Sequence, residues 1–77
     1  MNAKEIVKVI MEEKSITQAI MSDRLGISRQ AMWDRLNNKK NKDLSVAVLG
    51  DMLRALDCKI VVLPRETRTP KGGYEIE

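Results

Sequence analysis

The chain has 77 residues, a net charge of +3 and no histidine. This length allows one small domain and leaves little room for a catalytic cleft beside a core. Because histidine is the commonest general base and metal ligand, its absence argues against acid–base catalysis and against a metal site. The single cysteine, Cys58, leaves no internal disulfide, and an unpaired thiol fits a reducing cytoplasm. We therefore expect a cytoplasmic, non-enzymatic protein without metal, cofactor, small-molecule ligand or membrane segment.

Positive charge is concentrated in the middle of the chain. Residues 24–42 contain six Lys or Arg residues against one Asp, a net charge of +5, whereas residues 1–14 and 65–77 each sum to zero. A basic block of this kind is typical of proteins that bind polyanions such as nucleic acid. A solvated lysine-rich loop has the same composition, so charge alone leaves both interpretations open.

The spacing of apolar residues predicts four helices in the first 57 residues. They cover residues 2–14, 18–25, 29–36 and 46–57. Thr17, Ser28 and Ser45 stand where an N-cap is needed for the last three helices, because their hydroxyl oxygens accept hydrogen bonds from backbone N–H groups.

Glycine and asparagine mark the expected interruptions. Gly26 ends the second helix, since glycine adopts the left-handed conformation at no steric cost. Asn37-Asn38 ends the third, because asparagine tolerates left-handed dihedrals better than most residues. Gly50 lies inside the fourth helix at a cost of about 1 kcal/mol relative to alanine, which a close helix crossing or fraying would explain.

The end of the chain has a different period. Residues 59–63 form a β-branched run that predicts a strand, and residues 74–77 alternate as a short returning strand would. Both faces of the first strand are apolar, so a second copy of the chain is the simplest cover. The predicted dimer contacts are Ile60, Val61, Val62 and Leu63. The sequence thus predicts a mainly α-helical domain over residues 1–57 and a β-strand or hairpin tail over 58–77.

Two short helices joined by a three-residue turn with glycine are typical of a helix-turn-helix. The segment runs from Gln18 to Asn37. Small Ser22 is expected to face the partner helix, where a large side chain would push the two helices apart. The corner between the helices is expected to be filled by Met21, Leu25, Ile27 and Met32.

The stretch ITQAIMSDRLGISRQAM resembles the Cro/CI-type (Xre-like) DNA-binding domains of phage repressors and bacterial regulators. It shares with them Thr17-Gln18 at the start of the second helix, Leu-Gly-Ile-Ser at the turn and Asn37 before the lysines. Ser22 and Arg35 depart from the family pattern, which has alanine and an aliphatic residue there. Leu36 is expected to fill the corner in place of Arg35.

Helix geometry and the resemblance together indicate the residues that read DNA. With Met32 toward the core, the outward positions hold the base-reading candidates. These are Arg29, Gln30, Trp33 and Asp34. Arg29 suits guanine and Gln30 suits adenine. Asp34 either accepts from cytosine or orients Arg29 or Gln30. Trp33 either stacks on Arg29 or contacts DNA, or else it covers the core beside Leu36.

Phosphate contacts are expected from residues around the second and third helices and from the loop that follows. These are Thr17, Gln18, Ser28, Asn37, Lys39, Lys40 and Lys42. The favoured function is a repressor that binds a two-fold operator as a homodimer. The alternative is a protein-interaction module on the same scaffold, such as an antitoxin or a phage-encoded inhibitor, that also represses its own gene. In that alternative the apolar tail is the active surface.

Overall fold

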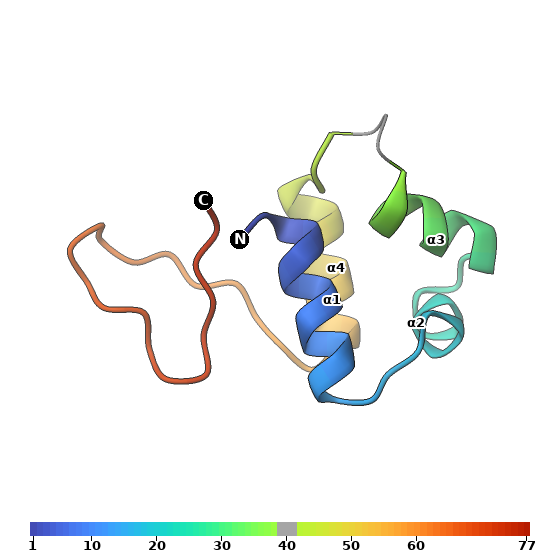
Figure 1. Ribbon diagram of the computed structural model, residues 1–77, viewed down its shortest axis with the longest axis horizontal. Coiled ribbons are helices and arrows are strands. Elements are labelled where there is room, and N and C mark those ends of the chain that lie inside the picture. Colours follow the sequence, from blue (N-terminus) through green and yellow to red (C-terminus); the bar gives the residue numbers. More distant parts are fainter. Residues whose placement is uncertain (39–41) are drawn as a thin grey trace.

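The computed structural model describes residues 1–38 and 42–77 and is built from four helices over that part of the chain. They are α1 (Ala3–Glu13), α2 (Gln18–Leu25), α3 (Arg29–Asn37) and α4 (Val46–Ala55). The helices α1 and α4 pack side by side, α2 and α3 lie at one end of the molecule, and the tail after α4 extends to the other (Figure 1). The predicted mainly α-helical fold with four helices is confirmed. None of these helices has the length and apolarity needed to cross a bilayer.

Each helix begins at a polar residue whose side-chain oxygen accepts a hydrogen bond from the backbone N–H three residues later. These residues are Asn2, Thr17, Ser28 and Ser45. The three predicted N-caps are confirmed. Asn2, which the sequence pattern placed inside the first helix, is the fourth.

The second and third helices end where the sequence predicts, at Gly26 and at Asn37-Asn38, and the fourth does not. Gly26 is left-handed, with φ +68°, as expected. Asn38 is extended, with φ −71° and ψ 113°, so the prediction of an asparagine in the left-handed region is wrong. The fourth helix ends at Ala55 rather than 57, because the chain turns out of the helix at Asp57, which has φ +59°.

Two cations lie at the C-terminal end of α4. The Lys14 Nζ group donates to the carbonyl oxygen of Leu56 at 2.6 Å, and an Arg24 guanidinium N–H donates to that of Ala55 at 2.8 Å. Positive groups are favourable here because the last carbonyls of a helix carry partial negative charge. Arg24, part of the basic block in the sequence, therefore stabilises the C-terminal end of α4.

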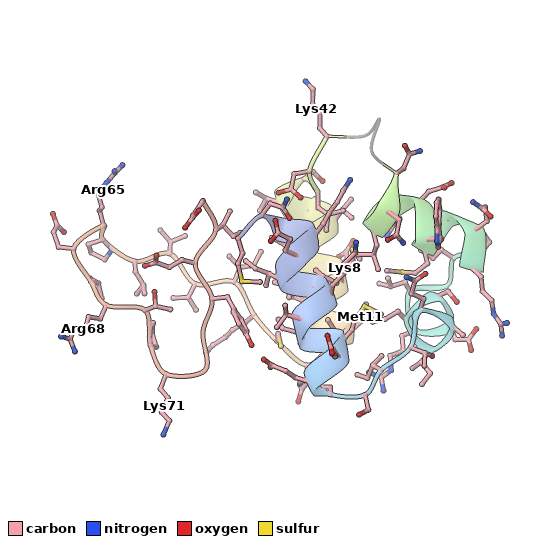
Figure 2. The ribbon with its side chains drawn as sticks, viewed as in Figure 1. Lys8, Met11, Lys42, Arg65, Arg68 and Lys71 are labelled. Carbon is pink, nitrogen blue, oxygen red and sulfur yellow. The ribbon has the colours of Figure 1, made fainter. Side chains whose placement is uncertain are left out.

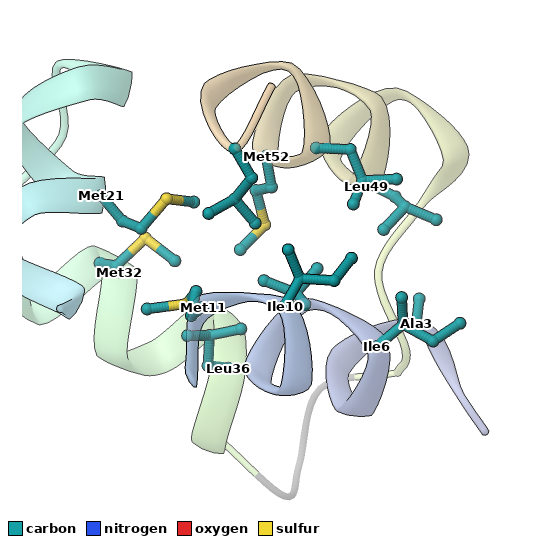
Figure 3. Packing of buried hydrophobic residues seen from close by; sticks show 12 residues of the cluster. Ala3, Ile6, Ile10, Met11, Met21, Met32, Leu36, Leu49 and Met52 are labelled. Carbon is teal, nitrogen blue, oxygen red and sulfur yellow. The ribbon is translucent and has the colours of Figure 1, made fainter. Parts of the chain in front are cut away.

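The core lies between α1 and α4, continues to the inner sides of α2 and α3, and is rich in methionine (Figure 3). Met21, Met32 and Met52 are completely buried. Leu36 is 2% exposed, which confirms that it fills the corner next to Arg35. In the part of the chain that the structure describes, every buried side-chain polar atom has a hydrogen-bond partner.

The two predicted strands are wrong: residues 59–63 and 74–77 form no strand in the described chain. A strand needs a neighbour that supplies matching N–H and C=O groups. Here the C-terminal segment returns to the other terminus instead, because the Glu77 N–H donates to the Met1 carbonyl oxygen at 3.0 Å. The Tyr74 hydroxyl donates to the Glu13 carboxylate on α1. Residues 59–63 are therefore left without a partner strand within one chain.

The environment of Gly50 also differs from the prediction. The atom nearest to a Cβ built at Gly50 is Ile60 Cδ1, at 3.9 Å, which comes from the tail and not from another helix. This distance is an ordinary van der Waals contact. No close helix crossing therefore accounts for this glycine.

Candidate nucleic-acid interface

The turn between α2 and α3 is fixed by backbone and side-chain contacts of α2. The Ile27 N–H donates to the Ser22 carbonyl oxygen at 3.0 Å, and Gly26 provides the left-handed residue that the bond requires. The Ser22 side chain is 2% exposed, and its hydroxyl donates to the Ala19 carbonyl oxygen at 2.8 Å. The expected burial of a small residue here is confirmed. The turn thus packs the short α3 directly against α2.

The opposite side of α3 faces solvent. Met32 and Leu36 are buried, whereas Arg29, Gln30 and Trp33 are exposed. Asp34 and Asn37 are half-buried on the edges of this face. The structure thus brings the four predicted base-reading residues together on the accessible side of α3, with their polar groups turned outward from the core.

Two hydrogen bonds order this face. The Gln30 Nε2 group donates to Asp34 Oδ1 at 3.1 Å, and the Asn37 Nδ2 group donates to the Trp33 carbonyl oxygen at 3.1 Å. The first contact favours the interpretation in which Asp34 orients Gln30. Trp33 is 50% exposed and is not one of the residues packed on the core, which favours contact outside the protein over a role in covering the core.

The predicted phosphate-contact residues are distributed around this face. Thr17 and Ser28 lie at the N-termini of α2 and α3, where their oxygens accept from Ile20 N–H at 3.2 Å and Ala31 N–H at 3.0 Å. Gln18 follows in the first turn of α2. The Lys42 side chain projects away from the helices (Figure 2). Lys39 and Lys40 lie outside the described residues.

The two described ends of the α3–α4 connection are tied to the first turn of α1. Lys4 Nζ donates to the Asn38 carbonyl oxygen at 3.2 Å. The Asp43 carboxylate accepts from the backbone N–H groups of Ala3 at 2.8 Å and Lys4 at 3.1 Å. Partial burial raises the pKa of Asp43, but these backbone N–H groups and that of Leu44 outweigh it, so the net pKa is below the ordinary value. No sequence pattern pairs Asp43 with α1, and the contact was not predicted.

A second group of basic side chains lies at the opposite end of the molecule from α3. Arg65, Arg68 and Lys71 point outward from the edge of the tail (Figure 2). Residues 65–77 sum to zero charge in the sequence. Two of their three carboxylates have contacts of their own: Glu75 accepts from the Thr69 hydroxyl at 2.7 Å, and Glu77 lies 3.8 Å from the terminal amine. This cluster is separate from the α3 surface.

The predicted dimer residues are exposed. Ile60, Val61 and Leu63 are 43%, 58% and 41% exposed, and Val62 is 92% exposed. Ile76 near the C-terminus is exposed as well. The tail therefore presents apolar side chains to solvent in a single chain.

Comparison with known families assigns most of the chain to one family. A family model for the Cro/C1-type HTH DNA-binding domain matches residues 7–61. The chain belongs to this family. The match spans α2, α3, α4 and most of α1, and it confirms the resemblance stated from residues 16–32. This Cro/C1-type protein is accordingly a helix-turn-helix DNA-binding protein. No curated protein and no solved structure matches the chain.

Proposed function

We propose that this Cro/C1-type protein is a transcriptional repressor that binds a two-fold operator as a homodimer. The observation that carries the proposal is the exposed polar face of α3, which begins directly after the Gly26 turn and is backed by buried Met32 and Leu36. A helix held in this way presents its N-terminal turn to the major groove.

Arg29 and Gln30 are the principal base-reading residues in this proposal. The guanidinium of Arg29 matches the two acceptors of guanine, and the amide of Gln30 matches adenine. The Asp34 carboxylate holds the Gln30 amide in place through their 3.1 Å hydrogen bond. Trp33 contacts a sugar or a thymine methyl group.

Phosphate contacts come from the N-terminal turns of α2 and α3 and from the two ends of the α3–α4 connection. The residues are Thr17, Gln18, Ser28, Asn37, Lys39, Lys40 and Lys42. Backbone N–H groups at the helix N-termini add to these side chains, since they carry partial positive charge. Such contacts position the protein without selecting sequence.

A pair of substitutions separates the two kinds of contact. Arg29→Ala is expected to lose roughly 1–3 kcal/mol of binding free energy and to relax selection at one base pair. Lys42→Ala is expected to weaken binding to all DNA sequences alike. It is also expected to reduce the slope of log binding constant against log salt concentration by about one. Binding to a selected site and to a scrambled duplex, measured over a salt series, checks both. Identical behaviour of the two variants contradicts the division.

The operator itself is found by selecting bound fragments from random DNA and footprinting the DNA upstream of the protein's own gene. The expected result is a protected two-fold site with half-sites about one helical turn, or about 34 Å, apart. Equal binding to the selected and the scrambled DNA contradicts sequence-specific repression.

Residues 60–63 form the dimer contact in this proposal. Their support is the exposed apolar character of the segment, because a group of exposed apolar side chains is typical of a protein–protein contact. Val61→Lys is expected to give monomers in analytical ultracentrifugation and weaker operator binding. Thr67→Lys, in the exposed turn of the same tail, is the matched control. An unchanged sedimentation profile of Val61→Lys contradicts the proposed interface.

A second candidate function is a protein-interaction module in which the tail binds another protein. The observation that favours it is that part of the exposed apolar tail, including Val62, Leu63 and Ile76, lies beyond the family match. Binding of a protein partner that survives Arg29→Ala and Gln30→Ala supports this candidate, whereas DNA binding that collapses with salt supports the first. The two roles are compatible in one chain.

A further inference from the structure

A shallow hollow of about 350 Å³ is lined by residues from the end of α2, the following turn, α3 and the second half of α4. Leu25 and Ile27 contribute apolar surface to it. Its charged side chains are Arg24, Arg35, Asp51 and Arg54. Three guanidinium groups from three different helices thus border one hollow, against a single carboxylate.

The hydrogen bonds of these arginines leave positive charge uncompensated. Arg24 donates to the Ala55 carbonyl oxygen at 2.8 Å, which is a neutral acceptor, and Arg54 lies 3.4 Å from Asp51. Arg35 is half-buried and has no hydrogen bond or ion pair among the described residues. Counting Asp51 against the three arginines leaves a net charge of +2 around the hollow.

The hollow is not on the DNA-reading face of α3. Arg35 is two residues from Trp33 and two from Asn37, which places it about 200° around the helix axis from each. DNA bound to the exposed face of α3 therefore leaves this side of the helix accessible. Arg35 also stands where the family resemblance implies an aliphatic residue, so the ordinary corner packing does not explain it.

We propose that this hollow binds a small multivalent oxyanion, a ligand that carries phosphate or paired carboxylate groups. Planar guanidinium groups match the oxygens of phosphate and carboxylate with two parallel hydrogen bonds. The volume of the hollow lies near the lower end of ordinary ligand sites, about 300–1,000 Å³, which suits a small anion. The bound anion links α2, α3 and α4 through Arg24, Arg35 and Arg54. This proposal departs from the sequence-based expectation of no small-molecule ligand.

The test uses the full chain and pyrophosphate as the probe, with succinate in a parallel arm. Two-dimensional NMR follows the arginine Nε–H signals during each titration, and sodium chloride at matched ionic strength is the reference. The expected result is a saturable shift of the Arg24, Arg35 and Arg54 signals that chloride does not reproduce. Saturation with pyrophosphate alone identifies a phosphate site, and saturation with succinate alone identifies a carboxylate site; either supports an oxyanion site.

Matched substitutions locate the binding. Arg35→Gln removes one guanidinium that makes no hydrogen bond or ion pair among the described residues, and it is expected to weaken anion binding by about tenfold or more. Arg29→Gln removes one exposed guanidinium from the DNA-reading face of the same helix, and it is expected to leave anion binding unchanged. Arg54→Gln provides a second variant from another helix, and circular dichroism checks that each variant is folded.

The proposal is overturned by shifts that chloride reproduces, by a titration that never saturates, or by equal losses in Arg35→Gln and Arg29→Gln. None of these measurements uses DNA. A failure of the anion site is therefore distinguishable from a failure of the proposed repressor function.

Discussion

At the scale of single residues, two glycines have opposite effects on stability. Gly26 has φ +68°, a conformation that side chains with a Cβ rarely adopt. Gly50 lies inside α4 with helical geometry, and among the described residues a Cβ there meets Ile60 Cδ1 alone, at 3.9 Å. The first glycine is needed by the turn, and the second is a cost to the helix.

Gly50→Ala is therefore expected to increase the free energy of unfolding by about 1 kcal/mol, because alanine is the better helix former. Gly26→Ala is the matched comparison and is expected to destabilise the protein by about 1 kcal/mol or more, since alanine is strained at positive φ. Urea unfolding followed by circular dichroism measures both. A Gly50→Ala variant that is less stable than the parent shows that Ile60 needs the space above this residue.

At the scale of helices, the N-terminus of α1 is stabilised from a distance. Asn2 accepts from the Glu5 N–H at 2.9 Å, as a local N-cap does. The Asp43 carboxylate accepts from two further N–H groups of the same turn and adds a negative charge next to the positive end of the helix dipole. The same contact fixes the start of the segment that leads into α4.

Asp43→Asn is expected to reduce the free energy of unfolding at neutral pH by about 0.5–1 kcal/mol. Because the pKa of Asp43 is lower in the folded state, its stabilising contribution is complete above the unfolded value of about 3.9 and is lost as pH falls through the folded value. The difference between parent and variant is therefore expected to shrink below about pH 4.

Unfolding by urea at several pH values tests this expectation. Asp51→Asn is the control, since Asp51 is an exposed carboxylate whose ion pair is with Arg54 in the same helix, and it is expected to have little effect. A difference between parent and Asp43→Asn that stays constant from neutral to acid pH contradicts the assigned role of the carboxylate.

At the scale of the whole molecule, hydrogen bonds near the C-terminus attach the tail to the helices. The Tyr74 hydroxyl donates to Glu13 on α1, and the Glu77 N–H donates to the Met1 carbonyl oxygen. These contacts bring the two termini together and close the tail into a loop (Figure 1). The hydrogen bond to Glu13, helped by partial burial and by the charge of Glu13, raises the pKa of Tyr74 above its ordinary value.

The single tyrosine makes this contact measurable by ultraviolet absorption. Tyr74 is expected to ionise above its ordinary value of about 10 in the parent and nearer to it in Glu13→Gln. Since the neutral phenol is the form that donates, the attachment is complete below about pH 10 and is lost as pH rises through the higher folded value. Glu12→Gln, the neighbouring exposed carboxylate, is the control. Equal titration midpoints in the parent and Glu13→Gln rule out the attachment.

The starts of the helices and the α2–α3 turn follow from the amino-acid sequence by itself. Thr17, Ser28 and Ser45 each bond a backbone group three residues away, and Gly26 acts on its own turn. The Gln30–Asp34 contact joins residues four positions apart on one helix face, and the predicted alternative in which Asp34 orients Gln30 describes it. Interactions that span only a few residues are determined by which residues stand side by side, and for that reason they were predictable.

The tertiary structure alone decided the path of the tail and the partners of the charged residues. Asp43 meets Ala3 across 40 positions, Arg24 meets Ala55 across 31, and Tyr74 meets Glu13 across 61. The β-branched run at residues 59–63 favours a strand locally, but a strand forms only where another segment supplies hydrogen bonds, and the C-terminal residues turn to Met1 instead. Contacts between distant residues depend on how the helices pack, and no periodic pattern in the sequence encodes that packing.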